Sequence, residues 1–576
     1  MSDTNRSSFV EPDSRRGSLA FFRFLLTFEY VFESTGHYGW FQCLVLVLTS
    51  IIECSIGLTL FTVLTEGLTF GWTWSCNTPV GGISNLNQTG DQWDRRDWCP
   101  IPGDDCTNLT FLGETTTVAT EWHLICEDQH LVRLTTVLFF AGSLGGSVIN
   151  GQLADAFGRR KMTLLFWTLM MILQALTGVS TSWIMYLTVR ICAGICVGAC
   201  TASNSVIAAE YMGSKGRVLA AQKFGRSLSL LLMSLFLYFI KNWRHRAFAT
   251  GLLWAPSAIA LFIFLPESAR WLLQKDRTAE AEAIVKKIAK YNRRSLPNLT
   301  FLTRIAETHK EERKGHDLYT YFDLFASRKY AVRTLSLLFI WFAKIVVMTG
   351  LENRITELNI ALKLTVLGAT MFIGKGISLY LANRFGRKKS FIANVLVVMT
   401  ITLCMLTVDV LDLYFGVDYK LIILTTLALV SLIAMTGLNM LAFCFVMETY
   451  PTLLRSTANG VANTFGEIGG IIAFYVPLLD VYHISIPYVI IFILAGISTI
   501  LVRVVMPETR DRDLLEELPQ GEQDGCCTGR CNRKCWCSAG SSDGITYEPE
   551  GEHKRDYNRD YVVLDFTQKR TSETPC

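Results

Sequence analysis

The sequence GQLADAFGRRK (Gly151–Lys161) occurs a second time, in altered form, as YLANRFGRKK (Tyr380–Lys389). Two further pairs follow in the same order: AAEYMGSKGR (208–217) with VMETYPTLLR (446–455), and PESARWLL (266–273) with PETRDRDLL (507–515). The copies are all separated by about 230 to 240 residues, which indicates an internal repeat. The chain is therefore expected to consist of two similar halves.

Each repeated motif follows an apolar run of about 20 residues, the length that an α-helix needs to cross a bilayer. Half of the 576 residues are hydrophobic, only 18% are charged, and the mean hydropathy is +0.32. We expect twelve spans, at residues 42–64, 132–152, 162–180, 183–207, 218–240, 247–265, 331–349, 359–381, 391–408, 420–446, 459–479 and 486–506. The sequence thus predicts an all-α membrane protein with twelve transmembrane helices in two six-helix halves. The net charge of +4 gives no reason to expect a nucleic acid as partner.

The spans and the repeat divide the chain into five parts. These are an N-terminal segment (1–41), a first six-helix half (42–265), a linker with amphipathic helices (266–330), a second six-helix half (331–506) and a Cys-rich tail (507–576). The excess of Lys and Arg in alternate short loops places both termini in the cytoplasm. Parallel halves of this kind form transporters whose substrate site lies between the halves, near the bilayer midplane.

A long segment, 65–131, separates the first two spans and is expected outside the membrane. It contains Cys76, Cys99, Cys106 and Cys126, which predicts two disulfides with three pairings left open. The same loop carries Asn-x-Thr sequons at Asn87 and Asn108, so we expect glycosylation there.

Charged residues at the expected cytoplasmic ends of the spans form candidate latches. The candidates are Asp155, Gly158, Arg159 and Arg160 in the first repeat copy, Arg387 in the second, and the pairs Glu210 with Arg217 and Glu448 with Arg455. Ion pairs among them would hold one access state and break in the other. The alternative is that these charges only anchor the topology. Asn383 replaces the acid in the second copy, so the two latches should differ in strength.

Residues 30–515 resemble the solute carrier family 22 of organic cation, zwitterion and anion transporters, within the major facilitator superfamily. The resemblance is carried by GHYGWFQ (36–42), TEWHLIC (120–126), GQLADAFGRRK, PESARWLL and ETYPTLLR. It implies the major facilitator fold and polyspecific transport of small organic ions at the plasma membrane, with coupling to protons or sodium left open and no cofactor. Arg190 in span 4 resembles an arginine found widely in this superfamily, which adds it to the gating candidates.

Ionisable residues inside spans are costly and usually mark a transport path. Asn459, Asn463 and Glu467 are spaced i, i+4, i+8 in span 11, so they share one helical face. In the organic cation transporters of the resembled family, an acid at the position of Glu467 binds the cationic substrate. The alternative is that Glu467 pairs with a structural lysine.

Two further residues bear on the substrate. Lys375 in span 8 matches a lysine of the resembled organic anion transporters, so the site is expected to hold both signs of charge. Trp341 in span 7 could stack on a quaternary ammonium, although a packing role is the alternative. These residues rank the substrates as cation first, zwitterion second and anion third.

Other functions and sites are weaker interpretations. A non-transporting receptor and a channel remain alternatives to a transporter, whereas an enzyme is not expected because the eight His are scattered and no nucleophile or metal spacing occurs. The cysteines of CCTGRCNRKCWC (526–537) are explained first by a loose compositional bias; palmitoylation is the next alternative and metal binding the last.

Overall fold

The computed structural model describes residues 28–66, 73–77, 83–84, 109–112, 115–124, 128–213, 216–222, 224–297, 299–312, 320–355, 358–415, 419–473, 475–476, 479, 482–483 and 485–510. All of them belong to one compact unit, Met1–Gln520. Residues 511–576, with the tail cysteines and the palmitoylation considered for them, lie outside the described residues.

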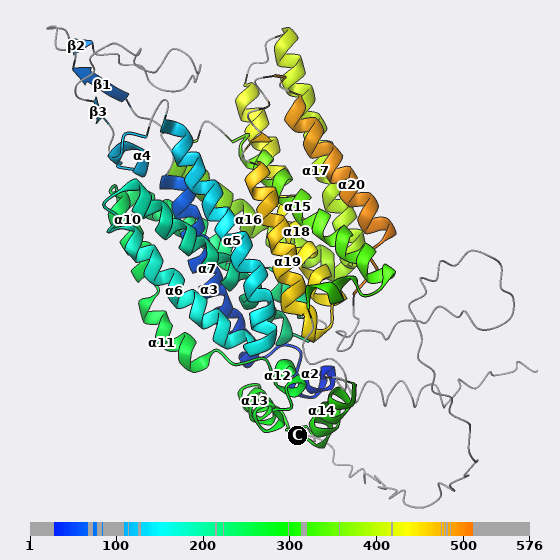
Figure 1. Cartoon of the computed structure of the whole chain (residues 1–576). Helices are drawn as coiled ribbons and strands as arrows, with labels where there is room; N and C mark the ends of the chain where they lie inside the picture. The colour runs from blue at the N-terminus through cyan, green and yellow to red at the C-terminus, as the bar shows by residue number, and fades with distance from the viewer. Residues whose placement is uncertain are drawn as a thin grey trace, which may run out of the picture. The chain divides into compact units, whose positions relative to one another are not determined.

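Helices occupy all twelve predicted spans (Figure 1). Those of the first half are α3 (Trp40–Glu66), α5 (Gln129–Phe157), α6 (Arg159–Thr177), α7 (Trp183–Glu210), α9 (Phe224–Phe239) and the pair α10 (Trp243–Leu252) and α11 (Ala255–Phe264). Those of the second half are α15 (Arg328–Glu352), α16 (Ile360–Phe385), α17 (Arg387–Phe415), α18 (Lys420–Thr449), α19 (Thr452–Ala473) and α20 (Ile486–Val504). The sixth span is interrupted before Pro256, whose ring removes a backbone donor and favours a fresh helix start.

Nine of the helices in the described part of the chain are long and apolar enough to cross a membrane. The other three predicted spans correspond to α6, α9 and α19. These three helices are shorter or more polar than the other nine. Helix α6 begins with three basic residues, α9 is only 16 residues long, and α19 carries Arg455 and Glu467. The side chains of α19 can be polar because the helix packs against α5, α7 and α15.

Shorter elements lie at the two ends of the bundle. At one end, here the linker end, are α2 (Glu29–Thr35), α8 (Arg217–Ala220), α12 (Ala269–Gln274), α13 (Thr278–Tyr291), α14 (Thr300–Glu312) and the 3-10 helix η2 (Tyr321–Phe325). At the other, here the loop end, are α4 (Val118–Glu121) and an antiparallel sheet of order β2-β1-β3, formed by β1 (Thr73–Asn77), β2 (Ile83–Ser84) and β3 (Leu109–Leu112). Figure 1 shows the two sets at opposite ends of the long helices.

The small sheet lies within the predicted outside loop and is a local departure from the all-α expectation. Cys76 is part of β1, opposite Ser84 in β2 and Leu109 in β3. The side chain of Cys76 and the residues Cys99, Cys106, Cys126, Asn87 and Asn108 lie outside the described part of the chain, so the disulfide and glycosylation predictions remain predictions.

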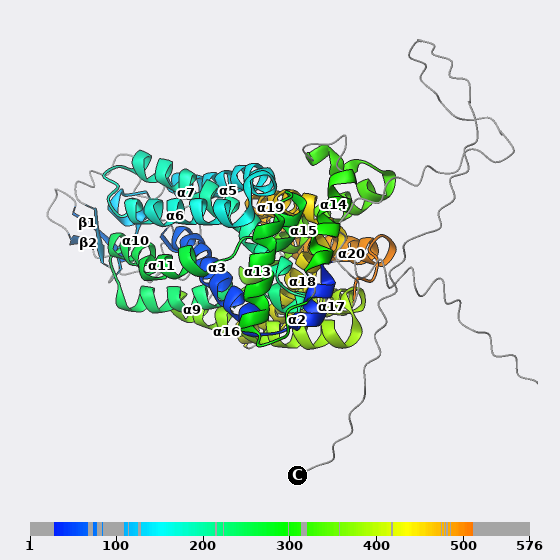
Figure 2. The ribbon, with the colours of Figure 1, turned by 90° about the horizontal axis from the view of Figure 1, so that it is seen from below.

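The linker helices form a layer beneath the spans, seen from below in Figure 2. The predicted amphipathic helix is α13, which buries Ala281, Val285 and Ile288. Asn292, just after α13, accepts a hydrogen bond from the Phe41 backbone N–H at 3.1 Å and donates one to Gln42 at 3.0 Å. This contact explains part of the GHYGWFQ motif, because it fixes the start of α3 to the linker.

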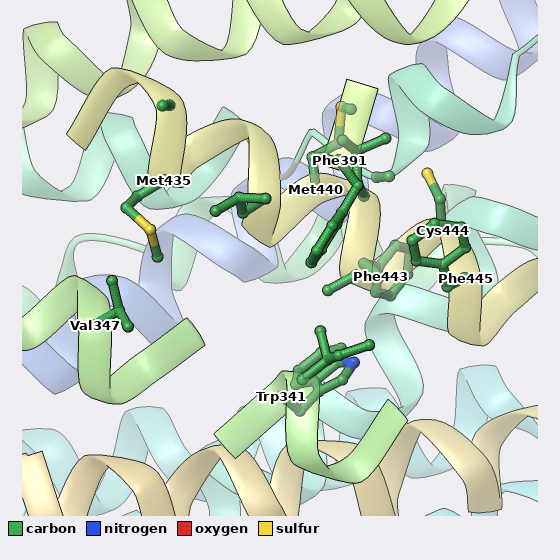
Figure 3. Packing of buried hydrophobic residues seen from close by; sticks show 14 of the residues in the cluster. Trp341, Val347, Phe391, Met435, Met440, Phe443, Cys444 and Phe445 are labelled. Atoms are coloured by element: carbon green, nitrogen blue, oxygen red, sulfur yellow. The ribbon is translucent and has the colours of Figure 1, made fainter. Parts of the chain in front are cut away.

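The spans meet at small residues. A Cβ on Gly146 of α5 would lie 1.9 Å from the backbone oxygen of Ile195 in α7, so the two helices approach as closely as glycine allows. Across the halves, α5 packs on α19 and α9 packs on α16. The largest apolar cluster lies mainly in the second half; Figure 3 shows Trp341 of α15 in it, together with Phe443, Cys444 and Phe445 of α18.

We expect Gly146→Ala to lower thermal stability, because the added methyl group would force α5 away from α7 at a cost of about 2 kcal/mol. Gly145→Ala is the matched control, since its Cβ would meet nothing within 4 Å. The melting temperature of the purified protein in detergent is the measurement. Equal melting temperatures for the two variants would contradict the close contact.

Candidate functional site

The polar residues that share one face of α19 contact the first half at both ends of the stripe. Asn459 donates a hydrogen bond to the backbone oxygen of Ala202 in α7 at 2.9 Å. Two turns later, Glu467 accepts one from the Ser143 hydroxyl of α5, also at 2.9 Å. Asn463 lies between them and is buried. The stripe thus spans the boundary between the halves.

Glu467 is accompanied by cationic groups from both halves. The charges of Arg226 on α9 and Lys344 on α15 both attract the Glu467 carboxylate. Lys344 is buried and donates a hydrogen bond to Asn439 of α18 at 2.6 Å. The carboxylate predicted to bind substrate therefore has two cationic groups of the protein near it, one from each half.

One face of the Trp341 ring is covered by a lysine of the same helix. The Lys344 ammonium lies 3.3 Å from the centroid of the Trp341 ring, and the ring itself is buried. An external quaternary ammonium would have to displace Lys344 to reach that face. The alternative that Trp341 packs within the core fits its surroundings better.

Lys375 lies at the contact between α9 and α16. Its side chain is buried, with the ammonium 5.5 Å from the ring centroid of Phe224 in the first half. Phe224 in turn stacks on Phe372 of α16 at 6.3 Å. Lys375 is thus directed from the second half toward the first, as a residue on the transport path would be.

An ion pair that the sequence analysis did not predict joins α3 and α9. Arg226 of α9 contacts Glu53 of α3 at 3.2 Å, and Glu53 is buried. Gly225 brings the helices together here, because a Cβ on it would lie 2.1 Å from the Ser50 backbone oxygen. The signal in the sequence was an arginine within span 5 and an acid within span 1, since two such charges inside a bilayer need partners.

At the linker end, the latch from the first repeat copy joins the two halves. Asp155 pairs with Arg159 at 2.8 Å and accepts two bonds, both 2.9 Å, from the backbone N–H and hydroxyl of Thr457 at the start of α19. Arg159 also donates to the backbone oxygen of Thr452 at 2.8 Å. Asn383, which replaces the acid in the second copy, is exposed. The two copies therefore differ as the missing acid predicts.

The PES and PET motifs supply the carboxylate for each latch turn. Glu267 accepts bonds from the backbone N–H groups of Arg159 and Arg160 at 2.9 and 3.1 Å, and Glu508 does the same for Arg387 and Lys388 at 2.9 and 3.1 Å. A carboxylate at a helix N-terminus satisfies free amides and the helix dipole. Burial raises the pKa of Glu267, although these N–H groups favour its charged form.

The preceding glycines make room for these carboxylates. Gly158 has φ +109° and Gly386 has φ +89°, values that residues with a Cβ rarely adopt. A Cβ on Gly158 would also lie 2.5 Å from Glu267. The repeated spacing of Gly-Arg and Pro-Glu was the signal that could have revealed Glu267 and Glu508.

The remaining gating candidates form further buried pairs. Arg455 contacts Glu210 across the halves at 3.1 Å, and Arg387 contacts Glu448 within the second half at 3.2 Å. Arg217 instead binds Glu29 of α2, an acid that the sequence analysis did not single out. The pairs predicted within each motif, Glu210 with Arg217 and Glu448 with Arg455, are therefore replaced by pairs between elements.

Arg190 is placed away from the boundary between the halves. It forms an ion pair with Glu66 of α3 and donates to Gln174 of α6 at 2.8 Å, while Tyr186 donates to Glu66 at 2.7 Å. These contacts tie α3, α6 and α7 together within the first half. A gating role for Arg190 remains a prediction, and its contacts identify it first as a packing residue.

The described residues of the TEWHLIC motif fasten the predicted outside loop to the first half. Glu121 accepts a bond from the Trp243 indole at 2.6 Å and pairs with Arg244 at 2.5 Å. Trp122 packs against Tyr186 and Trp243, with ring centroids 5.5 and 5.6 Å apart. This contact gives a structural reason for Arg244 at the loop end, where the excess of basic residues in cytoplasmic loops would not predict a positive charge.

Comparison with known proteins assigns the family. The family model "Sugar (and other) transporter" matches residues 87–520. A Drosophila melanogaster organic cation transporter protein is 30% identical over 417 residues, covering 70% of this chain and 74% of that protein. Human solute carrier family 22 member 13 is 30% identical over 412 residues, covering 70% and 71%. This chain belongs to solute carrier family 22.

The family and the fold agree. The rat organic cation/carnitine transporter 2 is 27% identical over 412 residues, covering 70% of this chain and 71% of the relative. A structure of the proton:xylose symporter XylE of the major facilitator superfamily matches with a TM-score of 0.55 at 16% identity, covering 82% of this chain and 97% of that one. The chain is therefore a multi-pass membrane transporter with the major facilitator fold, and its family consists of transporters rather than enzymes.

We expect Asp155→Asn to reduce the free energy that holds the two halves in contact at the linker end by about 1 to 3 kcal/mol. The substitution removes the charge that Arg159 pairs with and weakens the bonds from Thr457. The measurement is the initial uptake rate divided by the amount of protein at the cell surface, which should fall. Asn383→Ala is the matched control in the second copy and should leave the rate unchanged. Equal losses in both variants would contradict a latch made by Asp155 alone.

Proposed function

We propose that this protein transports small organic zwitterions by alternating access, with the substrate held between its two halves. The observation that carries the proposal is the mixed charge at the boundary between the halves: the charges of Lys344 and Arg226 attract the Glu467 carboxylate, and Lys375 is buried where α16 meets α9. A substrate with both signs of charge complements such a site, whereas a single charge meets repulsion from part of it.

The positions of these groups support a two-ended substrate. Glu467 lies on α19, whereas Lys344 and Lys375 lie on α15 and α16. A cationic group would bind Glu467, and an anionic group would bind one of the lysines. Glu53 is held by Arg226 in the first half, which leaves Glu467 as the acid best placed for the substrate.

Alternating access is supported by the contacts at one end of the bundle. Asp155, Arg159 and Glu210 of the first half all bind the second half at the linker end. Ion pairs of this type can break and re-form as the halves rock. We propose that this closed end faces the cytoplasm together with both termini, that the loop end is extracellular, and that the membrane is the plasma membrane.

A simple organic cation is the second candidate. It is favoured by the Glu467 carboxylate and by the relatives, one of which bears the name organic cation transporter protein. The structure adds an argument against it, because Lys344 already occupies the ring face of Trp341. Coupling to a proton or sodium gradient is compatible with either candidate.

Uptake of carnitine, tetraethylammonium and p-aminohippurate in oocytes tests the proposal. We expect saturable carnitine uptake that falls about tenfold or more in both Glu467→Gln and Lys344→Gln, because each variant leaves one end of the substrate without its counter-charge. The panel is run with and without proton and sodium gradients. Glu282→Gln and Lys286→Gln, which alter a partly exposed pair on α13, are the matched charge controls.

The outcomes separate the candidates. Uptake of tetraethylammonium alone, lost in Glu467→Gln and kept in Lys344→Gln, would replace the zwitterion with a cation. Uptake of p-aminohippurate alone would make the substrate an anion. Binding without flux would indicate a receptor, and flux that does not saturate would indicate a channel.

A further inference from the structure

The two halves carry a carboxylate and an arginine at matching positions, but they use them differently. Glu210 at the end of α7 is reached by Arg455 of the second half at 3.1 Å. Its counterpart, Glu448 near the end of α18, is reached by Arg387 of its own half at 3.2 Å. The repeat would have Arg217 of the first half cross over to Glu448 and complete a symmetric pair of ties.

Arg217 is positioned for that crossing but is engaged by another acid. It begins α8, which packs against α16 and α18 of the second half, and its charge attracts Glu448. Its guanidinium nevertheless donates to Glu29 of α2 at 2.5 Å. Glu29 is only 2% exposed, and a charge-assisted bond in such low-dielectric surroundings is strong.

Glu29 is anchored to the linker helices through a second arginine. Arg270 of α12 donates to the same carboxylate oxygen at 2.8 Å, and its guanidinium lies 5.0 Å from the Phe28 ring and 5.6 Å from the Phe32 ring. Phe28 and Phe32 are buried in an apolar cluster with residues of α12, α13 and α14. Burial alone would raise the pKa of Glu29, but the two guanidiniums outweigh it and lower the pKa, so the carboxylate is charged at neutral pH.

We propose that Glu29 is a positioning residue of the transport cycle, which holds Arg217 against Glu448 and so stabilises the arrangement closed at the linker end. The N-terminal helix α2 thereby supplies Arg217 with an anion at the point where Glu448 is engaged by Arg387. Without that charge, the buried guanidiniums of Arg217 and Arg270 would repel each other, and the closed arrangement would lose stability. The inference rests on the alternating-access part of the proposed function, and its test requires no substrate.

Hydrogen–deuterium exchange of the full chain in lipid nanodiscs tests this role. In Glu29→Gln, we expect backbone amides at the linker-end turns of α5 (151–157) and α19 (452–460) to exchange about tenfold faster, because the two helices separate more often. Glu282→Gln on α13 is the matched control and should leave exchange in both turns unchanged.

A second mutation distinguishes positioning from simple anchoring. If Glu29 acts through Arg217 and Glu448, the double mutant Glu29→Gln/Glu448→Gln should exchange its α5 and α19 amides little faster than Glu448→Gln alone. The two substitutions would then remove the same interaction, so their effects would not add. Faster exchange confined to α2 and α12–α14, with α5 and α19 unchanged, would show that Glu29 only anchors α2 and would overturn the proposal.

Arg270→Gln provides a second variant if Glu29→Gln does not fold. It keeps the Glu29 bond to Arg217 and the apolar contacts of Phe28 and Phe32, but it removes the ion pair between Glu29 and α12, so exchange in α5 and α19 should rise by a smaller factor. No rise in Arg270→Gln would overturn the proposal as well. A failed uptake panel would remove the substrate assignment and leave these exchange results unaffected.

Discussion

The structure depends on the rule that a charge within or beside a bilayer needs a partner supplied by the protein. Low-dielectric surroundings make an unpaired charge expensive and a paired one strong. Arg159 and Arg455 are fully buried, and both reach across to the opposite half of the molecule. Their partners therefore determine how the halves meet at the linker end, and exchanging those partners is a direct way to change which end is closed.

The same rule accounts for the departures from symmetry. The first latch has Asp155 bound to Thr457, whereas the second has an exposed Asn383 in its place. Arg217 turns to Glu29 rather than to the symmetric acid. Each half thus keeps its repeated backbone turn, including the glycine and the capping glutamate. The hydrogen bonds and ion pairs that each copy makes across the halves differ in number and in strength. A cycle with unequal ties need not have equally stable inward-facing and outward-facing states.

The centre of the molecule shows how the same side chains serve both stability and selectivity. Glu53 and Arg226 neutralise each other within the first half. Glu467, Lys344 and Lys375 lie on three different helices of the second half. The distances between these side chains therefore depend on how the helices pack and not on their separation along the chain. In the empty site these charged side chains contact other groups of the protein, and a bound substrate would replace some of those contacts with its own. The site can therefore hold charges without a large loss of stability when it is empty.

The sequence by itself determined the twelve helices, the two halves and the resemblance to the family, because hydrophobic run length and an internal repeat are properties of the chain order. It also placed the glycines and arginines of the latch turns, but not the capping Glu267 and Glu508. It also indicated that Asn459, Asn463 and Glu467 share a face, since helical periodicity requires it. It did not identify which acid pairs with which arginine: Glu210 and Arg217 are seven residues apart, yet each binds a residue more than 180 positions away. Those pairings, the contact of Lys344 with the Trp341 ring and the ion pairs of Glu29 were decided only by the tertiary structure, because they depend on how separate helices pack.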